Sequence, residues 1–269
     1  MADWELRRLE RDAAAGDPRS ATRQLCHLAR TGRISLDQVR VAAMLEGHLN
    51  LADGEERPAT AALIMLGIAP LSPTGVEALP RYERPFLVAE QARSGAGESV
   101  VGSAIWLLWA RDSARRAGDA WAEQGLPVSQ ATRIATAGNW ALSFYSETEG
   151  GSQQEVTEFL DASHQAREEL GELEQSVHQA LTSGVGPDNP LTRRRAAACQ
   201  LARVCCHLFD QRPIGVAEAA ALAIGRLERD YDSECAAIEA ERSWQIRHLI
   251  EMLLRQLTDA ELHGMPLLA

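Results

Sequence analysis

The sequence predicts an all-α protein, with a short N-terminal helical module followed by a bundle of long helices. Alanine and arginine, both strong helix formers, are abundant, whereas Val, Ile and Tyr are too sparse for a large sheet. Apolar residues recur at spacings of three and four along most of the 269 residues. A chain of this length can bury a sizeable core without disulfides or metal. Solenoid-like stacking of helix pairs is the alternative fold, although no repeat period recurs cleanly.

Residues 1–68 form the predicted N-terminal module. The first helix should end at the sequence GDP and the second at Thr31-Gly32, because glycine and proline interrupt helices. Ser35 and Gln38 have the spacing of a capping box, which predicts that a third helix begins there. The helices expected in this module cover 3–15, 18–30, 35–47 and 57–66.

Four prolines in residues 69–85 exclude a regular helix, so this stretch is the predicted linker. Residues 86–269 then form the long-helix bundle. Its helices are expected over 86–94, 98–124, 128–147, 152–182, 190–210 and 214–257, and the last could break near Asp232-Ser233.

The helix expected over 152–182 has one apolar stripe and one acidic face. Its apolar residues follow alternating spacings of three and four, which is a heptad seam. Seven carboxylates stand against one cation, Arg167. This pattern is typical of a helix that packs on one side and faces water on the other. The carboxylates that we expect to contact a partner are Glu158, Glu168, Glu169 and Glu172.

The charge of the chain excludes several classes of function. The formal net charge is −11, which opposes binding to nucleic acid or to anionic membranes and favours solubility or a basic partner. All 27 basic residues are arginine. The absence of lysine excludes a P-loop, a Schiff base and a kinase-type site. The sequence also contains no G-x-S-x-G or H-E-x-x-H motif, so it predicts no catalytic residues and no cofactor.

The N-terminal sequence MADWELRRLERD lacks the apolar core of a secretory signal, and the oily run over 99–110 is too short to span a bilayer. We therefore expect a cytoplasmic protein. Five cysteines, an odd number, fit free buried thiols better than disulfides in that compartment.

The sequence LARVCCHLF (201–209) raises the question of a metal or redox site. Three consecutive side chains of a helix point about 100° apart, so they cannot close on one ion. We expect Cys205 and Cys206 to pack in the core as small apolar side chains. The metal alternative pairs Cys206 with Asp210, one turn later, and Asp161 with His164 on the acidic helix.

The tryptophans of the middle helices are expected to fill the core rather than to mark a binding surface. The basic triplet 193–195 is expected to be solvated, or to pair with the acidic helix over 152–182.

Two stretches carry a resemblance to known proteins. LERDAAAGDPRSATRQLCHLARTGRISLDQVRVAAML resembles a small helical module of uncharacterised proteins from myxobacteria and similar GC-rich bacteria. AAIEAERSWQIRHLIEML (236–253) is similar to the last helix of alanine-rich proteins described as immunity proteins of bacterial toxin systems. The resemblance implies an all-α fold and a role in conflict between bacteria, and it supplies no catalytic residues.

Taken together, the sequence predicts a non-enzymatic protein that binds another, basic protein as an immunity or adaptor component of a toxin or defence system. This prediction is compatible with a protein that also forms homo-oligomers. The alternative is a helical enzyme or a binder of a small molecule or metal, with a site between the middle helices built from Trp140, Tyr145, His164 and the cysteines.

Overall fold

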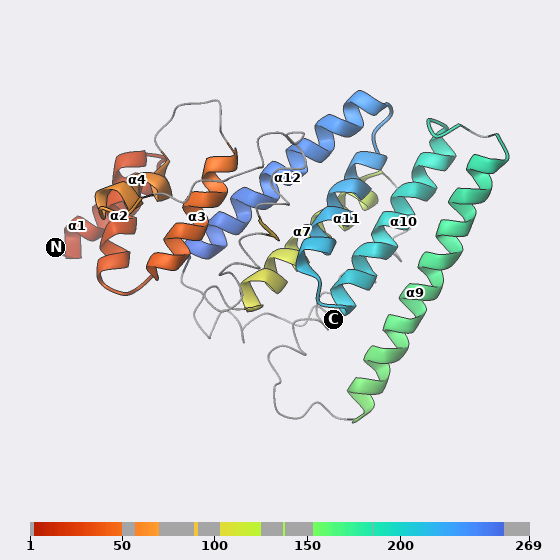
Figure 1. Ribbon diagram of the computed structural model, residues 1–269, viewed down its shortest axis with the longest axis horizontal. Coiled ribbons are helices and arrows are strands. Elements are labelled where there is room, and N and C mark those ends of the chain that lie inside the picture. The colour runs from red at the N-terminus through yellow and green to blue at the C-terminus, as the bar shows by residue number, and fades with distance from the viewer. Residues whose placement is uncertain are drawn as a thin grey trace. The chain divides into compact units, whose positions relative to one another are not determined.

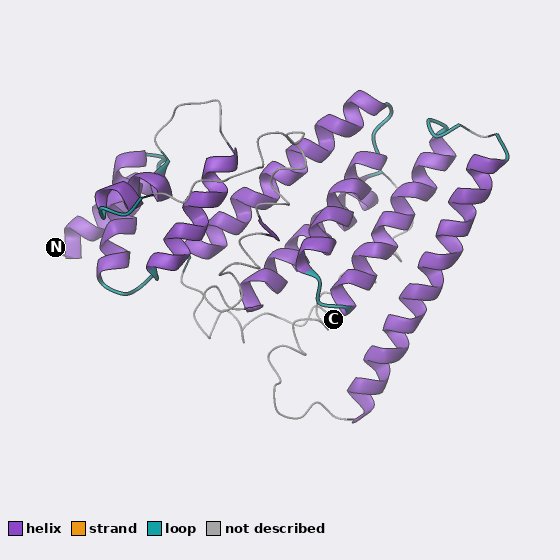
Figure 2. Ribbon diagram, viewed as in Figure 1, coloured by secondary structure: helices purple, strands orange, loops and turns teal. Residues whose placement is uncertain are grey.

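The structure is a computed structural model that describes residues 3–49, 57–69, 89–90, 103–124, 137, 153–184 and 186–255. Every regular element in these ranges is an α-helix (Figure 1, Figure 2). The predicted all-α class is therefore confirmed. Most of the predicted linker 69–85, and most of the helices predicted over 86–94 and 128–147, lie outside the described residues.

The chain divides into two compact units whose boundaries differ from those of the predicted domains. Unit 1 comprises residues 1–105 and 246–258, and unit 2 comprises residues 106–245 and 259–269. The prediction from prolines instead separates 1–68 from 86–269. Local sequence signals report where the backbone turns, but they do not report which distant segments pack together. The last helix is divided between the two units, since unit 2 includes it up to Gln245 and unit 1 includes it from Ile246.

Unit 1 contains four short helices: α1 (Asp3–Ala14), α2 (Pro18–Arg30), α3 (Leu36–Leu49) and α4 (Pro58–Met65). They confirm the four predicted helices to within two residues at each end. Local caps explain this agreement. The Asp17 carboxylate accepts the Ser20 N–H at 3.0 Å. The predicted capping box forms in both directions, since Gln38 N–H donates to Ser35 Oγ at 3.0 Å and Ser35 N–H donates to Gln38 Oε1 at 2.7 Å.

Helix α4 begins with a cap that comes from another helix. Arg57 at its N-cap makes no side-chain hydrogen bond to the helix, and Pro58 has no N–H to donate. The Glu46 carboxylate of α3 instead accepts the N–H groups of Ala59 and Thr60, at 3.5 and 3.2 Å. Burial raises the pKa of this carboxyl group, and the two amide hydrogen bonds oppose that rise. Glu46 thereby links α3 to α4 inside unit 1.

Unit 2 holds most of the longer helices: α7 (Ser103–Glu123), α9 (Gln153–Thr182), α10 (Pro190–Phe209), α11 (Pro213–Arg226) and the first part of α12 (Tyr231–Leu254). Helix α10 lies between α9 and α11 and packs on both (Figure 1). Its start follows the predicted signal, because Asn189 accepts the Leu191 N–H at 2.9 Å directly before Pro190.

The core of unit 2 is built largely from small residues. Ala110, Ala114 and Ala117 form one stripe of α7, and they join a buried cluster with α10 and α11. Small side chains at these positions let the helices approach closely, which explains why the chain is rich in alanine. Larger side chains, Trp121, Leu201 and Leu208 among them, complete the cluster. Outside it, Trp109 Nε1–H donates to the backbone oxygen of Gln245 at 2.8 Å and so joins α7 to α12. The predicted burial of tryptophan is confirmed for Trp106, Trp109 and Trp121, whereas Trp140 lies outside the described residues.

The helix expected over 214–257 is divided, as the sequence allowed, because α11 ends at Arg226 and α12 begins at Tyr231. The break falls just before the predicted Asp232-Ser233. Asp230 caps the new helix by accepting Ser233 N–H at 2.8 Å and Ser233 Oγ–H at 3.0 Å, which lowers the pKa of the Asp230 carboxyl group. The two helices then pack very closely, since a Cβ atom at Gly225 would lie 2.5 Å from Ile238 Cγ1.

Arg193 is buried, which corrects the expectation of a solvated basic triplet. Its side chain is 5% exposed. The guanidinium group donates to Glu234 Oε2 at 2.8 Å, to the backbone oxygen of Glu228 at 2.8 Å and to that of Asp230 at 3.4 Å. It therefore joins the start of α10 to the α11–α12 connection and to α12 itself. It does not pair with the acidic helix α9.

The remaining two arginines of the triplet, Arg194 and Arg195, are exposed as predicted. The buried Glu234 carboxylate receives a second cation, because Arg226 Nη1 lies 3.1 Å from its Oε1 atom. Asp188 supplies the second carboxylate, because its Oδ1 atom lies 3.5 Å from Arg193 Nη1, so two cations face two carboxylates within unit 2. Among the helices that the structure describes, none is both long enough and apolar enough to cross a membrane.

Replacing two glycines tests the packing of α11 on α12. Gly225→Ala should lower the free energy of unfolding by about 1–3 kcal/mol, because the new methyl group collides with Ile238. Gly171→Ala, in α9, is the matched control: its Cβ atom would meet nothing within 4 Å, so it should raise stability by about 0.5–1 kcal/mol. Urea unfolding of the two variants measures both changes. Equal stabilities would contradict the close approach.

Glu46 makes a pH-dependent contribution to stability. Because its pKa is raised in the folded protein, the folded state holds the proton to a higher pH than the unfolded chain does. The contribution is therefore greatest below the ordinary pKa and falls as pH rises through the raised pKa. The wild-type protein should lose stability relative to Glu46→Gln over that rise, measured by urea unfolding at several pH values. Glu46→Ala should be less stable than Glu46→Gln throughout, because two amides lose their acceptor.

A wild-type protein that gains stability relative to Glu46→Gln as pH rises would contradict the raised pKa of this buried carboxyl group.

Candidate functional site

Helix α9 packs on one neighbour and leaves most of its circumference open. Among the described helices its main contact is with α10. Of its described side chains, Ser163 and Ala180 are fully buried, and most of the predicted heptad seam is half-buried. Phe159 does contact α10, edge to face with Phe209, with 5.2 Å between ring centroids. A 30-residue helix with so little buried surface presents a long face to solvent.

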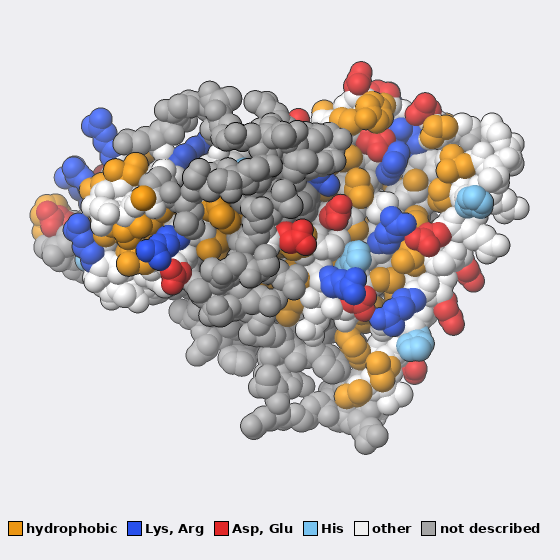
Figure 3. All heavy atoms as spheres, viewed as in Figure 1, with side chains coloured by type: hydrophobic (Ala, Val, Ile, Leu, Met, Phe, Trp, Pro, Cys, Tyr) orange, Lys and Arg blue, Asp and Glu red, His pale blue; other side chains and the backbone are white. Residues whose placement is uncertain are grey.

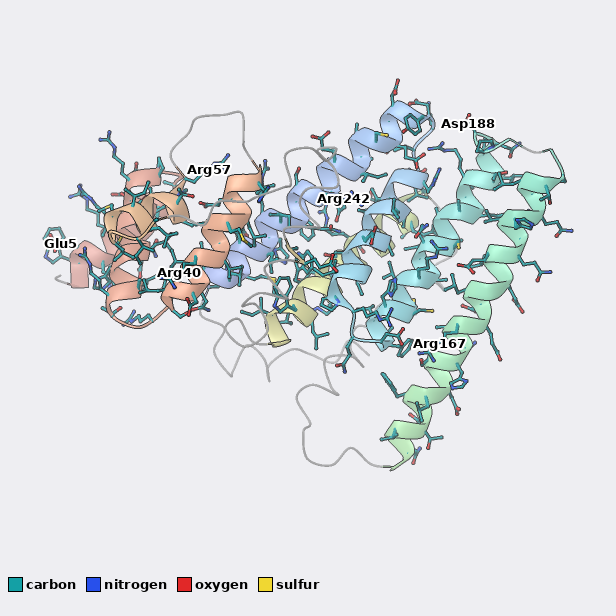
Figure 4. All side chains as sticks on the ribbon, viewed as in Figure 1. Glu5, Arg40, Arg57, Arg167, Asp188 and Arg242 are labelled. Atoms are coloured by element: carbon teal, nitrogen blue, oxygen red, sulfur yellow. The ribbon has the colours of Figure 1, made fainter. Side chains whose placement is uncertain are left out.

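Two ion pairs join α9 to α10. Arg167 Nη2, on the residue of α9 that is labelled in Figure 4, lies 2.7 Å from Asp210 Oδ1. Arg203 Nη2 lies 2.8 Å from Glu174 Oε1. All four side chains are partly exposed, so each pair is worth about 0–1 kcal/mol. The pairs fix how α9 is rotated and aligned along α10, rather than supplying much stability.

Four other carboxylates of α9 lie on the side of the helix away from α10. We call Glu158, Asp161, Glu168 and Glu172 the outer face, since all four are exposed. At 100° per residue they fall within roughly 80° of the helix circumference. Figure 3 shows carboxylate atoms along the edge of α9 that lies away from α10. Glu158 accepts a hydrogen bond from Gln154 at 3.0 Å, and the other three make no ion pair within the described part of the chain.

The outer face matches the predicted partner-binding residues in part. Glu158, Glu168 and Glu172 are exposed on it, whereas Glu169 is half-buried. The fourth residue of the outer face is Asp161, which is not among the four predicted partner contacts. The sequence alone does not show that Glu174 forms an ion pair while its neighbours on α9 do not, because its partner Arg203 is 29 residues away. One feature of the sequence could have indicated an ion pair between helices. Arg167 is the only arginine of the acidic helix, so it is suited to pair with a carboxylate of a neighbouring helix.

The cysteines of α10 are buried in the core, as predicted. Cys199, Cys205 and Cys206 are each less than one-tenth exposed. Burial raises the pKa of the Cys199 and Cys206 thiols, and Asp210 adds to the rise at Cys206. A raised pKa disfavours the thiolate, which is the reactive and metal-binding form. His207 is half-buried, and burial lowers the pKa of its imidazole.

The structure places Asp210 close enough to Cys206 to raise its pKa, but it does not bring these two residues together with Asp161 and His164. Asp210 is held by Arg167, which occupies the carboxylate that would accompany Cys206. Asp161 and His164 are exposed, whereas Cys206 is buried. Within the described ranges, no group of three or more His, Cys, Asp or Glu side chains is arranged to hold a metal ion.

The alternative site between the middle helices falls mainly beyond what the structure describes. Trp140 and Tyr145 lie outside the described residues. His164, the third residue of that prediction, is exposed on α9, and the α10 cysteines are buried. The residues placed by the structure therefore do not form one pocket.

No protein-family model, no curated protein and no solved structure matches this chain. The outer face of α9 is therefore the feature of the chain that best indicates a function.

Proposed function

We propose that this chain is a non-enzymatic binding protein that recognises a basic surface of another protein through the outer face of α9. The observation that carries the proposal is that some charged side chains of α9 are paired with α10, whereas others are exposed without an ion pair. Glu174 and Arg167, which lie toward α10, are paired with it, while Asp161, Glu168 and Glu172 are exposed without an ion pair in the described part of the chain.

Unpaired, exposed carboxylates suit recognition because a cationic partner need not displace an internal ion pair. The net charge of −11 extends the same sign over the protein as a whole. Charge complementarity of this kind accelerates association and excludes partners of like charge. It also disfavours nucleic acid and anionic lipid, which carry the same sign as the outer face.

The resemblance of residues 236–253 to the last helix of helical immunity proteins supports a more specific role for the chain. We propose an immunity or adaptor component of a bacterial toxin or defence system, acting in the cytoplasm. A toxin that carries a basic surface is the kind of partner that the outer face would attract.

Neutralising the outer face tests the proposal. The triple variant Asp161→Asn, Glu168→Gln and Glu172→Gln keeps the shape of these side chains but removes three charges. In a pull-down from the native host it should lose a stoichiometric partner that the wild-type protein retains. The association rate constant for that partner should fall on the order of tenfold at low salt, because electrostatic steering is lost.

The matched control removes three exposed carboxylates elsewhere, through Glu123→Gln, Glu228→Gln and Glu251→Gln. It makes the same change in net charge, so it should recover the partner as the wild-type protein does. Recovery of no partner by the wild-type protein, or equal recovery by both triple variants, would count against the proposal.

A further inference from the structure

Helix α2 carries exposed arginines on one side and no carboxylate of its own. Its 13 residues, Pro18–Arg30, include three arginines and lack aspartate and glutamate, and Asp17 before them is engaged as the cap. Arg19, Arg23 and Arg30 are exposed, and none of them makes an ion pair within the described part of the chain. At 100° per residue they fall within about 40° of the helix circumference. We call these three residues the basic stripe, and Figure 3 shows arginine atoms over this part of unit 1.

The spacing of the basic stripe matches that of the unpaired carboxylates of α9, read in the opposite direction. From the end of α2 to its start, the arginines are separated by seven and then four residues. From the start of α9, Asp161, Glu168 and Glu172 are also separated by seven and then four residues. These carboxylates too fall within about 40° of their helix, and both sets span about 16 Å of axis. The match is specific to the antiparallel direction, because no three residues of the outer face have intervals of four and then seven.

Two helices laid side by side in opposite directions would place one arginine against each carboxylate. The three resulting pairs are Arg30 with Asp161, Arg23 with Glu168, and Arg19 with Glu172. Arginine is suited to such contacts, because its planar guanidinium group can donate two parallel hydrogen bonds to one carboxylate. An exposed row of arginines is ordinarily only solvated, but this register gives each of them a defined acceptor.

We propose that the basic stripe of α2 in one copy of this chain binds the outer face of α9 in a second copy, with the two helices antiparallel. Nucleic acid and anionic lipid also attract arginine, but neither presents single negative charges at the intervals that the outer face provides. Because the outer face is also the proposed partner site, a basic partner and a second copy exclude each other there. Only this exclusion rests on the proposed function.

The net charge of −11 determines the salt concentration at which this contact forms. At about 0.01 M salt the screening length is about 30 Å, so two acidic proteins repel one another before they meet. At about 0.15 M salt it is about 8 Å, which suppresses that repulsion while charges in direct contact still attract. At about 1 M salt the contact pairs are screened as well. Self-association should therefore be strongest near the intermediate salt concentration.

Analytical ultracentrifugation of the full chain at about 0.1–1 mM tests the contact, since exposed ion pairs are individually weak. The average mass of the wild-type protein should rise with concentration at about 0.15 M salt. Two charge-reversal variants should each associate about tenfold or more weakly, because like charges then meet. The stripe variant carries Arg19→Glu, Arg23→Glu and Arg30→Glu, and the face variant carries Asp161→Arg, Glu168→Arg and Glu172→Arg. All six residues are exposed, so the fold should persist, as circular dichroism will show.

Mixing the two variants tests the pairing directly. The stripe variant retains the acidic outer face and the face variant retains the basic stripe, so an equimolar mixture should associate where neither variant does alone. Both variants keep a negative net charge, so attraction between oppositely charged proteins cannot produce this rescue.

The matched control for the stripe variant combines Arg194→Glu, Arg195→Glu and Arg229→Glu. These three arginines are exposed outside the basic stripe, and their reversal changes the net charge by the same amount. The control should therefore associate as the wild-type protein does.

Three results would overturn the inference: a wild-type protein that stays monomeric throughout, equal association of the stripe variant and its control, or no association in the mixture. Association that grows steadily up to about 1 M salt would assign the contact to apolar surfaces and would overturn it too. Recovery of the native partner separates this inference from the proposed function. If the wild-type protein is monomeric but binds that partner through the outer face, the proposed function stands and this inference fails. If it self-associates as expected but recovers no partner, this inference stands and the proposed function fails.

Discussion

The buried ion pair between Arg193 and Glu234 is the interaction on which the arrangement of unit 2 most depends. Both side chains are almost fully buried. Removing one partner from a buried pair leaves the other charge uncompensated, which is far more damaging than losing an exposed ion pair. Arg193 also donates to backbone oxygens of the α11–α12 connection. One side chain thus holds the start of α10, the turn between α11 and α12, and α12.

The position of α9 follows from that of α10. Helix α9 packs mainly on α10, and its two ion pairs to α10 determine which of its carboxylates face outward. The candidate site is therefore built in steps, from a buried pair that fixes α10 to exposed pairs that align α9 upon it. Because the helix beneath is fixed by a buried pair, the exposed carboxylates of α9 have defined positions, although each exposed ion pair contributes little energy.

Much of the fold could be predicted from the sequence because its signals are local. Asp17, Ser35 and Asn189 each cap a helix within three residues of themselves, so the pattern alone locates those starts. Burial of Cys205 and Cys206 follows from helical spacing. Arg193 could not be distinguished from Arg194 in the same way, because the acceptors that bury it lie 35–41 residues further along the chain.

The same limit applies to Glu46, whose role as the cap of α4 depends on how α3 meets α4, and to the division of the last helix between two units. For the candidate site, the sequence predicted an acidic face and named three of its four residues. It could not predict that Glu174 would be paired, because the pairing depends on how α9 is aligned with α10.

Urea unfolding of Arg193→Ala and Arg194→Ala measures how much the buried ion pair contributes to holding α10 and α12 together. Both variants remove one positive charge, at adjacent positions of the same helix, but only the first removes a buried side chain. Arg193→Ala should lose about 3–5 kcal/mol of stability, and Arg194→Ala should stay within about 0.5 kcal/mol of the wild-type protein. Equal and small losses would contradict the role of this pair, because Arg193 would then not hold these helices together.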